Sequence, residues 1–254
     1  MTSADRLPLS AVLITRNAAS QLGECLASVD FCDEIMVVDS GSEDETVAIA
    51  EARGARVVQC DWRGFGPQKQ FAVEQASHDW VLCIDADERV SEGLREGILA
   101  ALSAPTHRSY RFARCNRFMG RYLKHGEGYP DWSLRLFDRR RARWSDDAVH
   151  EKVLATGKTG TLPGDLLHDS AESLETYLAK QNRYSTLAAE AALACGKRAT
   201  VMHLLLSPLL RFMKFYFLRM GLLDGLPGLV HILVGCAASF AKYAKMLDFQ
   251  RSNQ

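Results

Sequence analysis

Short apolar segments alternate with helical patterns through the first 100 residues, and this alternation constrains the fold more than any other feature. Four segments have the length and composition of buried strands: Leu9–Thr15, Glu34–Asp39, Arg56–Cys60 and Trp80–Asp85. Helical patterns follow them at 20–29, 44–53, 67–77 and 91–102. Strands that alternate with helices form right-handed βαβ units. The sequence therefore predicts an α/β fold with a mostly parallel sheet and helices on both faces.

Polar side chains follow the predicted strands. Asn17 follows the first strand, Asp39 ends the second before Ser40-Gly41-Ser42, and Asp85-Ala86-Asp87-Glu88 ends the fourth. Open α/β sheets bind ligands at this edge. Mg²⁺ and Mn²⁺ prefer oxygen ligands and commonly bridge one or two carboxylates to substrate phosphates, so the acidic run suggests a nucleotide-diphosphate site. The alternative is the acidic first turn of a helix, and we assign Glu88 to that start.

The pattern changes after residue 102. Residues 109–115 and 133–138 have the pattern of longer antiparallel strands, and the chain from Ser173 onward is helical. We expect two domains, a nucleotide-binding and catalytic domain over 1–170 and a helical region over 171–254.

Two apolar segments of the helical region, 201–220 and 226–246, suggest contact with a membrane. Prolines and cations interrupt them, and each is short for a membrane span. This pattern favours helices that lie in the membrane interface beside anionic lipid. Helices buried against the sheet or in an oligomer interface would show similar patterns.

Cysteine usage and charge limit the compartment and the partners. The chain has 7 cysteines without Cys-x-x-Cys spacing, and its N-terminus lacks a signal-peptide pattern, so we expect a cytoplasmic protein. Residues 1–100 carry 8 Lys and Arg against 18 Asp and Glu, whereas residues 101–150 carry 11 against 5. The chain is neutral as a whole and contains no nucleic-acid module, so we do not expect a nucleic-acid partner. The arginines suit a phosphorylated or acidic saccharide, or form a solvated face.

Four ordered motifs resemble those of the family 2 glycosyltransferases. They are Asn17, Val38-Asp39-Ser40-Gly41-Ser42 with Asp44 and Thr46, Gly66-x-x-Lys69-Gln70-x-Ala72, and Asp85-Ala86-Asp87-Glu88. Later segments resemble the bacterial lipopolysaccharide core β-1,4-glucosyltransferase group of that family. These are Pro130-Asp131-Trp132 through Phe137, Val149-His150-Glu151, His168, Lys180 with Tyr184, and 221–225.

The resemblance implies a GT-A fold, a Rossmann-like sheet that binds a nucleotide-sugar with a divalent cation. It implies that Asp39 recognises the nucleoside, that Asp87 is the chief metal ligand and that Asp85 supports the ribose or the metal shell. Lys69 would neutralise the diphosphate. His168 would complete the metal shell, which favours Mn²⁺ over Mg²⁺ because imidazole is a softer ligand than oxygen; a buried structural histidine is the alternative.

Transfer with inversion needs a base beside the acceptor hydroxyl, and two carboxylates compete for that role. Glu151 lies where similar enzymes carry a His-Glu pair, and Asp131 lies before a predicted strand. The resemblance favours Glu151. Either carboxylate could instead pair with Arg135, which we assign with Asn17 to substrate binding. His150 would orient Glu151 or line the acceptor pocket.

The expected function is that of an inverting, metal-dependent hexosyltransferase. It would move glucose from UDP-glucose onto the inner core of lipopolysaccharide at the inner face of the cytoplasmic membrane. One alternative keeps the fold and makes the acceptor polyprenyl phosphate or another glycolipid. The alternative from another class is a non-catalytic membrane scaffold that binds a nucleotide-sugar.

Overall fold

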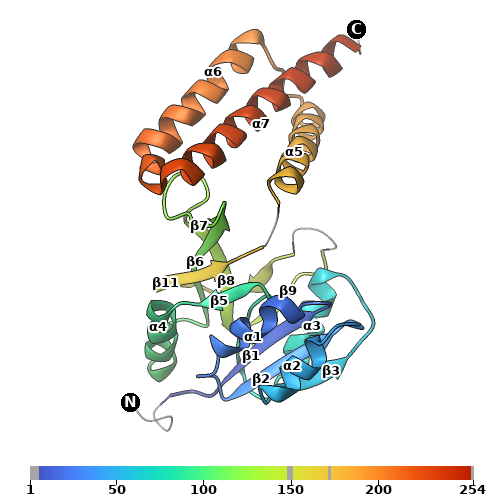
Figure 1. The fold of residues 1–254 in the computed structure, drawn as a ribbon, viewed down its shortest axis with the longest axis vertical. Coiled ribbons are helices and arrows are strands. Elements are labelled where there is room, and N and C mark those ends of the chain that lie inside the picture. The colour runs from blue at the N-terminus through green and yellow to red at the C-terminus, as the bar shows by residue number, and fades with distance from the viewer. Residues whose placement is uncertain (1–5, 148–150, 171–172, 253–254) are drawn as a thin grey trace. The chain divides into compact units, whose positions relative to one another are not determined.

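The computed structural model describes residues 6–147, 151–170 and 173–252. The chain forms two compact units, one from residues 1–114 and 131–169 and the other from residues 115–130 and 170–254. Figure 1 labels most elements of both. The first unit is α/β and the second is mainly helical, so residues 115–130 leave the α/β unit and join the helices.

The α/β unit is built on a mixed sheet with the strand order β3-β2-β1-β4-β8-β6-β11-β5. The strands are β1 (Leu9–Thr15), β2 (Glu34–Asp39), β3 (Arg56–Gln59), β4 (Trp80–Cys83), β5 (Glu88–Val90), β6 (Ser109–Phe118), β8 (Asp131–Asp138) and β11 (Gly160–His168). A separate two-stranded sheet pairs β9 (Ala142–Trp144) with β10 (Val153–Ala155).

Only half of the main sheet is parallel. β1 pairs in parallel with β2 and β4, and β2 with β3, whereas β8 is antiparallel to β4 and β6, and β11 is antiparallel to β5. The GT-A fold is confirmed, but the prediction of a mostly parallel sheet overstated its parallel part. The reason is that the described residues between β6, β8 and β11 form no helix, and parallel neighbours need a long crossover connection.

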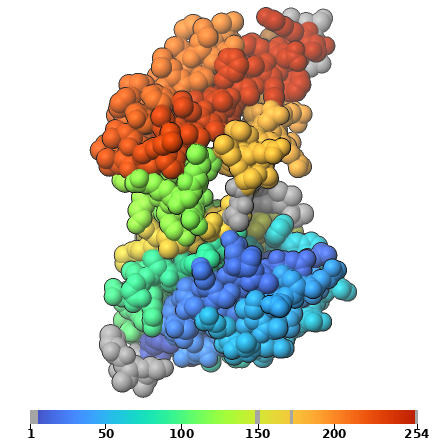
Figure 2. All heavy atoms as spheres, viewed as in Figure 1, coloured from blue at the N-terminus to red at the C-terminus, as the bar shows by residue number. Residues whose placement is uncertain are grey.

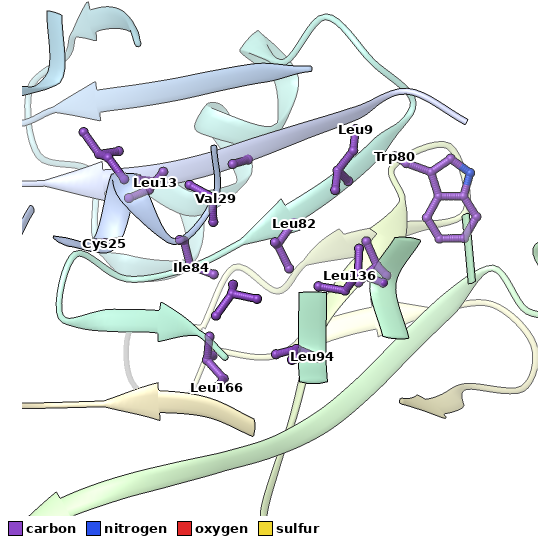
Figure 3. Close-up of a cluster of buried hydrophobic side chains, with 14 of the residues drawn as sticks. Leu9, Leu13, Cys25, Val29, Trp80, Leu82, Ile84, Leu94, Leu136 and Leu166 are labelled. Atoms are coloured by element: carbon purple, nitrogen blue, oxygen red, sulfur yellow. The ribbon is translucent and has the colours of Figure 1, made fainter. Parts of the chain in front are cut away.

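Helices cover both faces of the sheet, as predicted. They are α1 (Ala19–Ala27), α2 (Thr46–Ala52), α3 (Phe65–Gln75) and α4 (Glu92–Ser103). Because side chains of a strand alternate between faces, Leu9 and Leu13 of β1 pack with α1 and α4 (Figure 3), whereas Val12 packs with α3 on the other face. These two apolar layers hold β1 and β4 at the centre of the sheet. The carboxyl ends of the two strands therefore lie together at one edge of the sheet.

The helical unit consists of three long helices and the segment 115–130. The helices are α5 (Leu174–Ala194), α6 (Val201–Phe212), which continues as a π-helix over Met213–Leu218, and α7 (Gly225–Ser252); a 3₁₀ turn over Gly221–Asp224 precedes α7. Both α5 and α6 pack against α7. The short strand β7 (Arg121–Tyr122) pairs with the end of β6, and Asp224 accepts backbone hydrogen bonds from Lys124 and His125.

One of the two apolar helices is longer than expected from the sequence: residues 221–252 extend beyond the predicted 226–246, whereas residues 201–218 fall within the predicted 201–220. Residues 201–218 and 221–252 each have the length and composition of a membrane span. Pro227 does not interrupt α7, because proline is tolerated in the first turn of a helix. All residues of α6 and its π-helical continuation are described, and none of their side chains is buried. In Figure 2 these residues form part of the outer surface of the helical unit, coloured orange.

Candidate active site

A cavity of about 560 Å³ lies at the carboxyl ends of β1 and β4. Six of the residues predicted from the sequence line it: Asn17, Lys69, Asp85, Asp87, Glu151 and His168. They come from five separate stretches of the chain. The position of the cavity follows the rule that open α/β sheets bind ligands outside the carboxyl ends of their strands.

The pairing of β5 with β11 brings His168 beside Asp87. His168 is the register partner of Glu88, and the Asp169 amide donates a hydrogen bond to the Asp87 carbonyl at 2.9 Å. The His168 Nε2 atom then lies 3.3 Å from the Asp87 Oδ2 atom. One carboxylate and one imidazole therefore face the cavity together.

This pair fits a divalent cation whose remaining ligands come from a substrate. The described part of the chain contains no group of three His, Cys, Asp or Glu side chains that could hold a metal by itself. Asp85 lines the same cavity and contacts Lys69 and Arg135, and its predicted place in the metal shell stays a prediction. Mg²⁺ and Mn²⁺ sites on nucleotides often have only one or two protein carboxylates and take phosphate oxygens for the rest.

Lys69 lies between two carboxylates of the cavity. Its Nζ atom is 3.1 Å from Asp85 Oδ1 and 3.1 Å from Glu151 Oε1, and it lies 4.8 Å from the ring centre of Trp144. The side chain is 8% exposed, so its charge is held at one place in the cavity wall. A buried ammonium group at this point can bind a further anion.

Arg135, which the sequence predicts to bind substrate, is not among the described residues that line the cavity. It is 5% exposed, and its Nη2 atom contacts Asp85 Oδ2 at 2.9 Å and Glu88 Oε1 at 3.3 Å. Burial alone would raise the pKa of Asp85, but the charges of Arg135 and Lys69 outweigh it and hold that pKa well below the usual range. Asp85 is therefore ionised and fixed.

Glu88 does not begin a helix, which corrects the sequence interpretation. It lies in β5 and is fully buried, whereas α4 begins at Glu92 after the Ser91 cap. Its Oε2 atom accepts the Asp85 amide at 2.9 Å. Burial raises the pKa of Glu88 above its ordinary value, although Arg135 opposes this effect.

Asp39 holds the turn after β2, and its expected contact with a nucleoside stays a prediction. It is fully buried, and its two oxygens accept hydrogen bonds from the Gly41 and Ser42 amides and from the Thr15 and Ser42 hydroxyls. Gly41 has φ 80°, a conformation that favours glycine. Asp39 therefore shapes the turn and is not among the described residues that line the cavity.

Asn17 depends on that turn. Its φ is 51°. Its backbone N–H donates a hydrogen bond to Ser42 Oγ at 2.8 Å, and its side-chain Oδ1 atom accepts one from the Glu43 backbone N–H at 2.9 Å. Asp39 holds Ser42 in place, and Ser42 in turn accepts the hydrogen bond from Asn17. The buried aspartate therefore fixes the cavity wall around Asn17 indirectly.

The two candidates for the base have different environments. Glu151 lines the cavity beside Lys69. Asp131 is not among the described residues of the cavity wall, and it accepts hydrogen bonds from Arg114 at 2.9 and 2.7 Å. His150 lies outside the described residues. The geometry therefore favours Glu151.

Sequence reasoning missed an aromatic pair in the cavity wall. The Trp62 and Phe65 rings meet edge to face at 4.8 Å, and the residues are 45% and 51% exposed. Trp62 lies between β3 and α3, and Phe65 is the first residue of α3. The available signal was two large aromatic residues in a polar, glycine-containing stretch at a strand end.

A half-parallel, Rossmann-like sheet with acidic side chains around a cavity at its strand ends defines this protein as one of the GT-A class. Residues 10–154 match the family described as Glycosyl transferase family 2. The chain belongs to this family and is a glycosyltransferase.

Full-length relatives extend the likeness beyond the matched region. The lipopolysaccharide core biosynthesis glycosyltransferase LpsC of Rhizobium meliloti (strain 1021) is 36% identical over 95% of this chain and 92% of its own. An uncharacterized glycosyltransferase, RP128, of Rickettsia prowazekii (strain Madrid E) is 29% identical over 97% of this chain and 89% of its own. The crystal structure of S. aureus TarS 1-349 in complex with UDP superposes with a TM-score of 0.50 at 15% identity, over 98% of this chain and 92% of that chain. That structural likeness concerns the fold.

Proposed function

We propose that this glycosyltransferase moves glucose from UDP-glucose to the inner core of lipopolysaccharide, with inversion at the anomeric carbon. The observation that carries the proposal is that Lys69 links a strand-end acid, Asp85, to Glu151 in the cavity that also holds the Asp87–His168 pair. Groups suited to a diphosphate and to an acceptor hydroxyl thus share one wall. The name of the Rhizobium relative supports lipopolysaccharide core as the acceptor.

On the donor side, Asp87 and His168 would hold Mg²⁺ or Mn²⁺ against the diphosphate. The bound cation would neutralise charge that develops on the leaving UDP. Lys69 would contribute a second positive charge, and Asp85 would keep Lys69 in place. Asn17 would form the wall of the nucleotide site at the end of β1.

On the acceptor side, Glu151 would accept the proton of the attacking hydroxyl. A general base must lie within hydrogen-bond reach of that proton, and Glu151 is the candidate that faces the cavity. In the structure its carboxylate contacts Lys69 at 3.1 Å.

We further propose that the protein acts at the cytoplasmic face of the inner membrane, bound to its surface through the helical unit. Residues 197–223 carry five cations, Lys197, Arg198, Arg211, Lys214 and Arg219, and no acid. Exposed leucines of α6 lie within the same stretch, with Leu205 60% and Leu210 64% exposed. Apolar side chains beside cations suit an interface rich in anionic lipid.

The donor half of this proposal is tested by calorimetric titration of UDP with and without Mn²⁺, on the wild type and on Asp87→Ala. We expect Mn²⁺ to strengthen UDP binding to the wild type and to have no effect on the variant. The matched control is Asp146→Asn, which removes an exposed acid that pairs with Arg143 at 3.3 Å. Equal responses to Mn²⁺ in the wild type and Asp87→Ala would show that Asp87 does not hold the metal.

A further inference from the structure

Behind the cavity, acidic and basic side chains alternate in an unbroken series of contacts. The series runs through Glu151, Lys69, Asp85, Arg135, Glu88, Arg114 and Asp131, with successive closest contacts of 3.1, 3.1, 2.9, 3.3, 3.6 and 2.7 Å. The two carboxylates that compete for the role of base are its two ends. Glu88 and Arg135 are its most buried members, at 0% and 5% exposed.

Stability alone does not account for this buried pair. An ion pair taken out of water loses hydration that its mutual attraction barely repays, and well-packed apolar side chains are often as stable. The arrangement of atoms indicates another role. Glu88 Oε2 accepts the Asp85 amide at 2.9 Å, while Glu88 Oε1 contacts Arg135. One nitrogen of Arg135 then contacts Asp85 Oδ2 at 2.9 Å.

Glu88 and Arg135 together therefore hold Asp85 at both its backbone amide and its side chain. The Arg135 guanidinium is further restrained by Ser133 Oγ at 3.0 Å and by the Trp144 ring, whose centre lies 5.5 Å from its Cζ atom. Since Asp85 Oδ1 contacts Lys69, the orientation of Asp85 also sets the position of the lysine. The turn that carries Asp87 starts from the same restrained residue.

We propose that Glu88 and Arg135 are positioning residues, which fix Asp85 and thereby hold Lys69 and the Asp85–Asp87 turn in place for the donor diphosphate. The inference rests on the proposed function, because it assumes that the cavity binds a nucleoside diphosphate. Neither residue touches the ligand; both act through Asp85.

The test measures UDP binding in the presence of Mn²⁺ for Glu88→Gln and Arg135→Lys, with thermal unfolding of each variant. Glutamine keeps an acceptor for the Asp85 amide and removes the charge, and lysine keeps the charge but lacks the guanidinium fork. We expect UDP to bind about 10- to 100-fold more weakly to each, as for other residues that orient metal-site groups. If Glu88→Gln does not fold, Arg135→Lys carries the test.

The matched control is Asp138→Asn. Asp138 lies on β8, as Arg135 does, is 1% exposed, and pairs with Arg140 at 2.8 Å, but it is not among the described residues of the cavity wall or of the charge series. Its loss should lower the unfolding temperature and leave UDP binding within about threefold of the wild type, since distant sites act independently.

A double-mutant cycle separates positioning from general stability. In an Asp85→Asn background, Glu88→Gln should change UDP binding less than about twofold, because the residue through which it acts is already altered. Equal weakening by Glu88→Gln in both backgrounds, or none in either, would overturn the inference. A wild type that does not bind UDP would instead overturn the proposed function, and the inference with it.

Discussion

Asp85 and Asp87 are two positions apart in the chain, yet their side chains have different surroundings. Asp85 is held by Lys69 and Arg135, whereas Asp87 faces the cavity beside His168. The difference arises because Asp85 follows the end of β4 next to the buried Arg135. Asp87 instead lies where the chain runs beside the end of β11. Within this one motif, Asp85 therefore organises the cavity wall, and Asp87 is available to a ligand.

Substitution of the two candidate bases should give opposite results. Glu151→Gln should lower kcat by about 10²- to 10⁴-fold, because a base contributes on that order, and leave UDP binding nearly unchanged. Asp131→Asn removes a carboxylate paired with Arg114 and should lower kcat less than about tenfold. Steady-state kinetics with a fixed acceptor measure both. A larger loss of kcat in Asp131→Asn would reverse the assignment.

At the scale of elements, the close approach of α3 to the stretch after β9 determines where Lys69 sits. A Cβ atom on Gly66 would lie 2.1 Å from the Ser145 carbonyl oxygen, a backbone atom that cannot turn away. Gly66→Ala should therefore destabilise the protein by about 1–3 kcal/mol, the usual cost of overpacking, and weaken UDP binding through a shift of α3. Denaturant unfolding measures the change.

Gly23→Ala is the matched control for that substitution. Gly23 lies in α1, and the nearest side-chain atom to an added Cβ would be 3.9 Å away, on Ile49. Alanine should stabilise this helix by about 0.5–1 kcal/mol. If both alanines stabilise the protein, α3 is free to move and Gly66 is not a packing constraint.

Glu34 joins the start of β2 to its neighbours and predicts a pH dependence of stability. Its carboxylate accepts hydrogen bonds from Ser10 Oγ and from the Ser77 amide and hydroxyl, and pairs with Arg56. Burial opposes ionisation, but these bonds outweigh it and lower the pKa of Glu34 from 4.5 to about 2. A depressed carboxyl pKa stabilises the folded state above the unfolded pKa, and this stabilisation is lost as pH falls toward 2.

The wild type should therefore unfold at a higher temperature than Glu34→Gln at pH 7, and the two curves should converge between about pH 4.5 and 2. Thermal unfolding across that range measures the difference. A gap that is independent of pH would mean that the hydrogen bonds of Glu34, and not its charge, stabilise the sheet.

The parts of the fold that depend on local sequence were predictable, and those that depend on distant pairing were not. The bounds of β1 and β2 were predicted to the residue, because their apolar runs end at polar turn residues. Glu88 was misassigned because its place in β5 depends on pairing with β11, about 80 residues later in the sequence. The burial of Arg135 and Asp39 likewise depends on partners that the sequence does not place beside them.

For the whole molecule, the prediction concerns its attachment to membranes. We expect the protein to sediment with vesicles that contain anionic lipid and to bind more weakly as salt rises, because surface charges are screened. The double variant Leu205→Glu/Leu209→Glu on α6 should lose this binding. Leu154→Glu, a charge introduced on β10 of the α/β unit at a 41% exposed leucine, should retain it. Vesicle binding that survives the α6 substitutions would place the attachment elsewhere.

The proposed function is that this protein transfers glucose from UDP-glucose to a lipopolysaccharide inner core. The most direct measurement is a transfer assay with a panel of radiolabelled nucleotide-sugars and Mn²⁺, with core-truncated lipopolysaccharide and polyprenyl phosphate as separate acceptors. The account predicts label from UDP-glucose on the lipopolysaccharide, lost in Glu151→Gln and in Asp87→Ala. Label on polyprenyl phosphate alone, or UDP binding without transfer to either acceptor or to water, would contradict it.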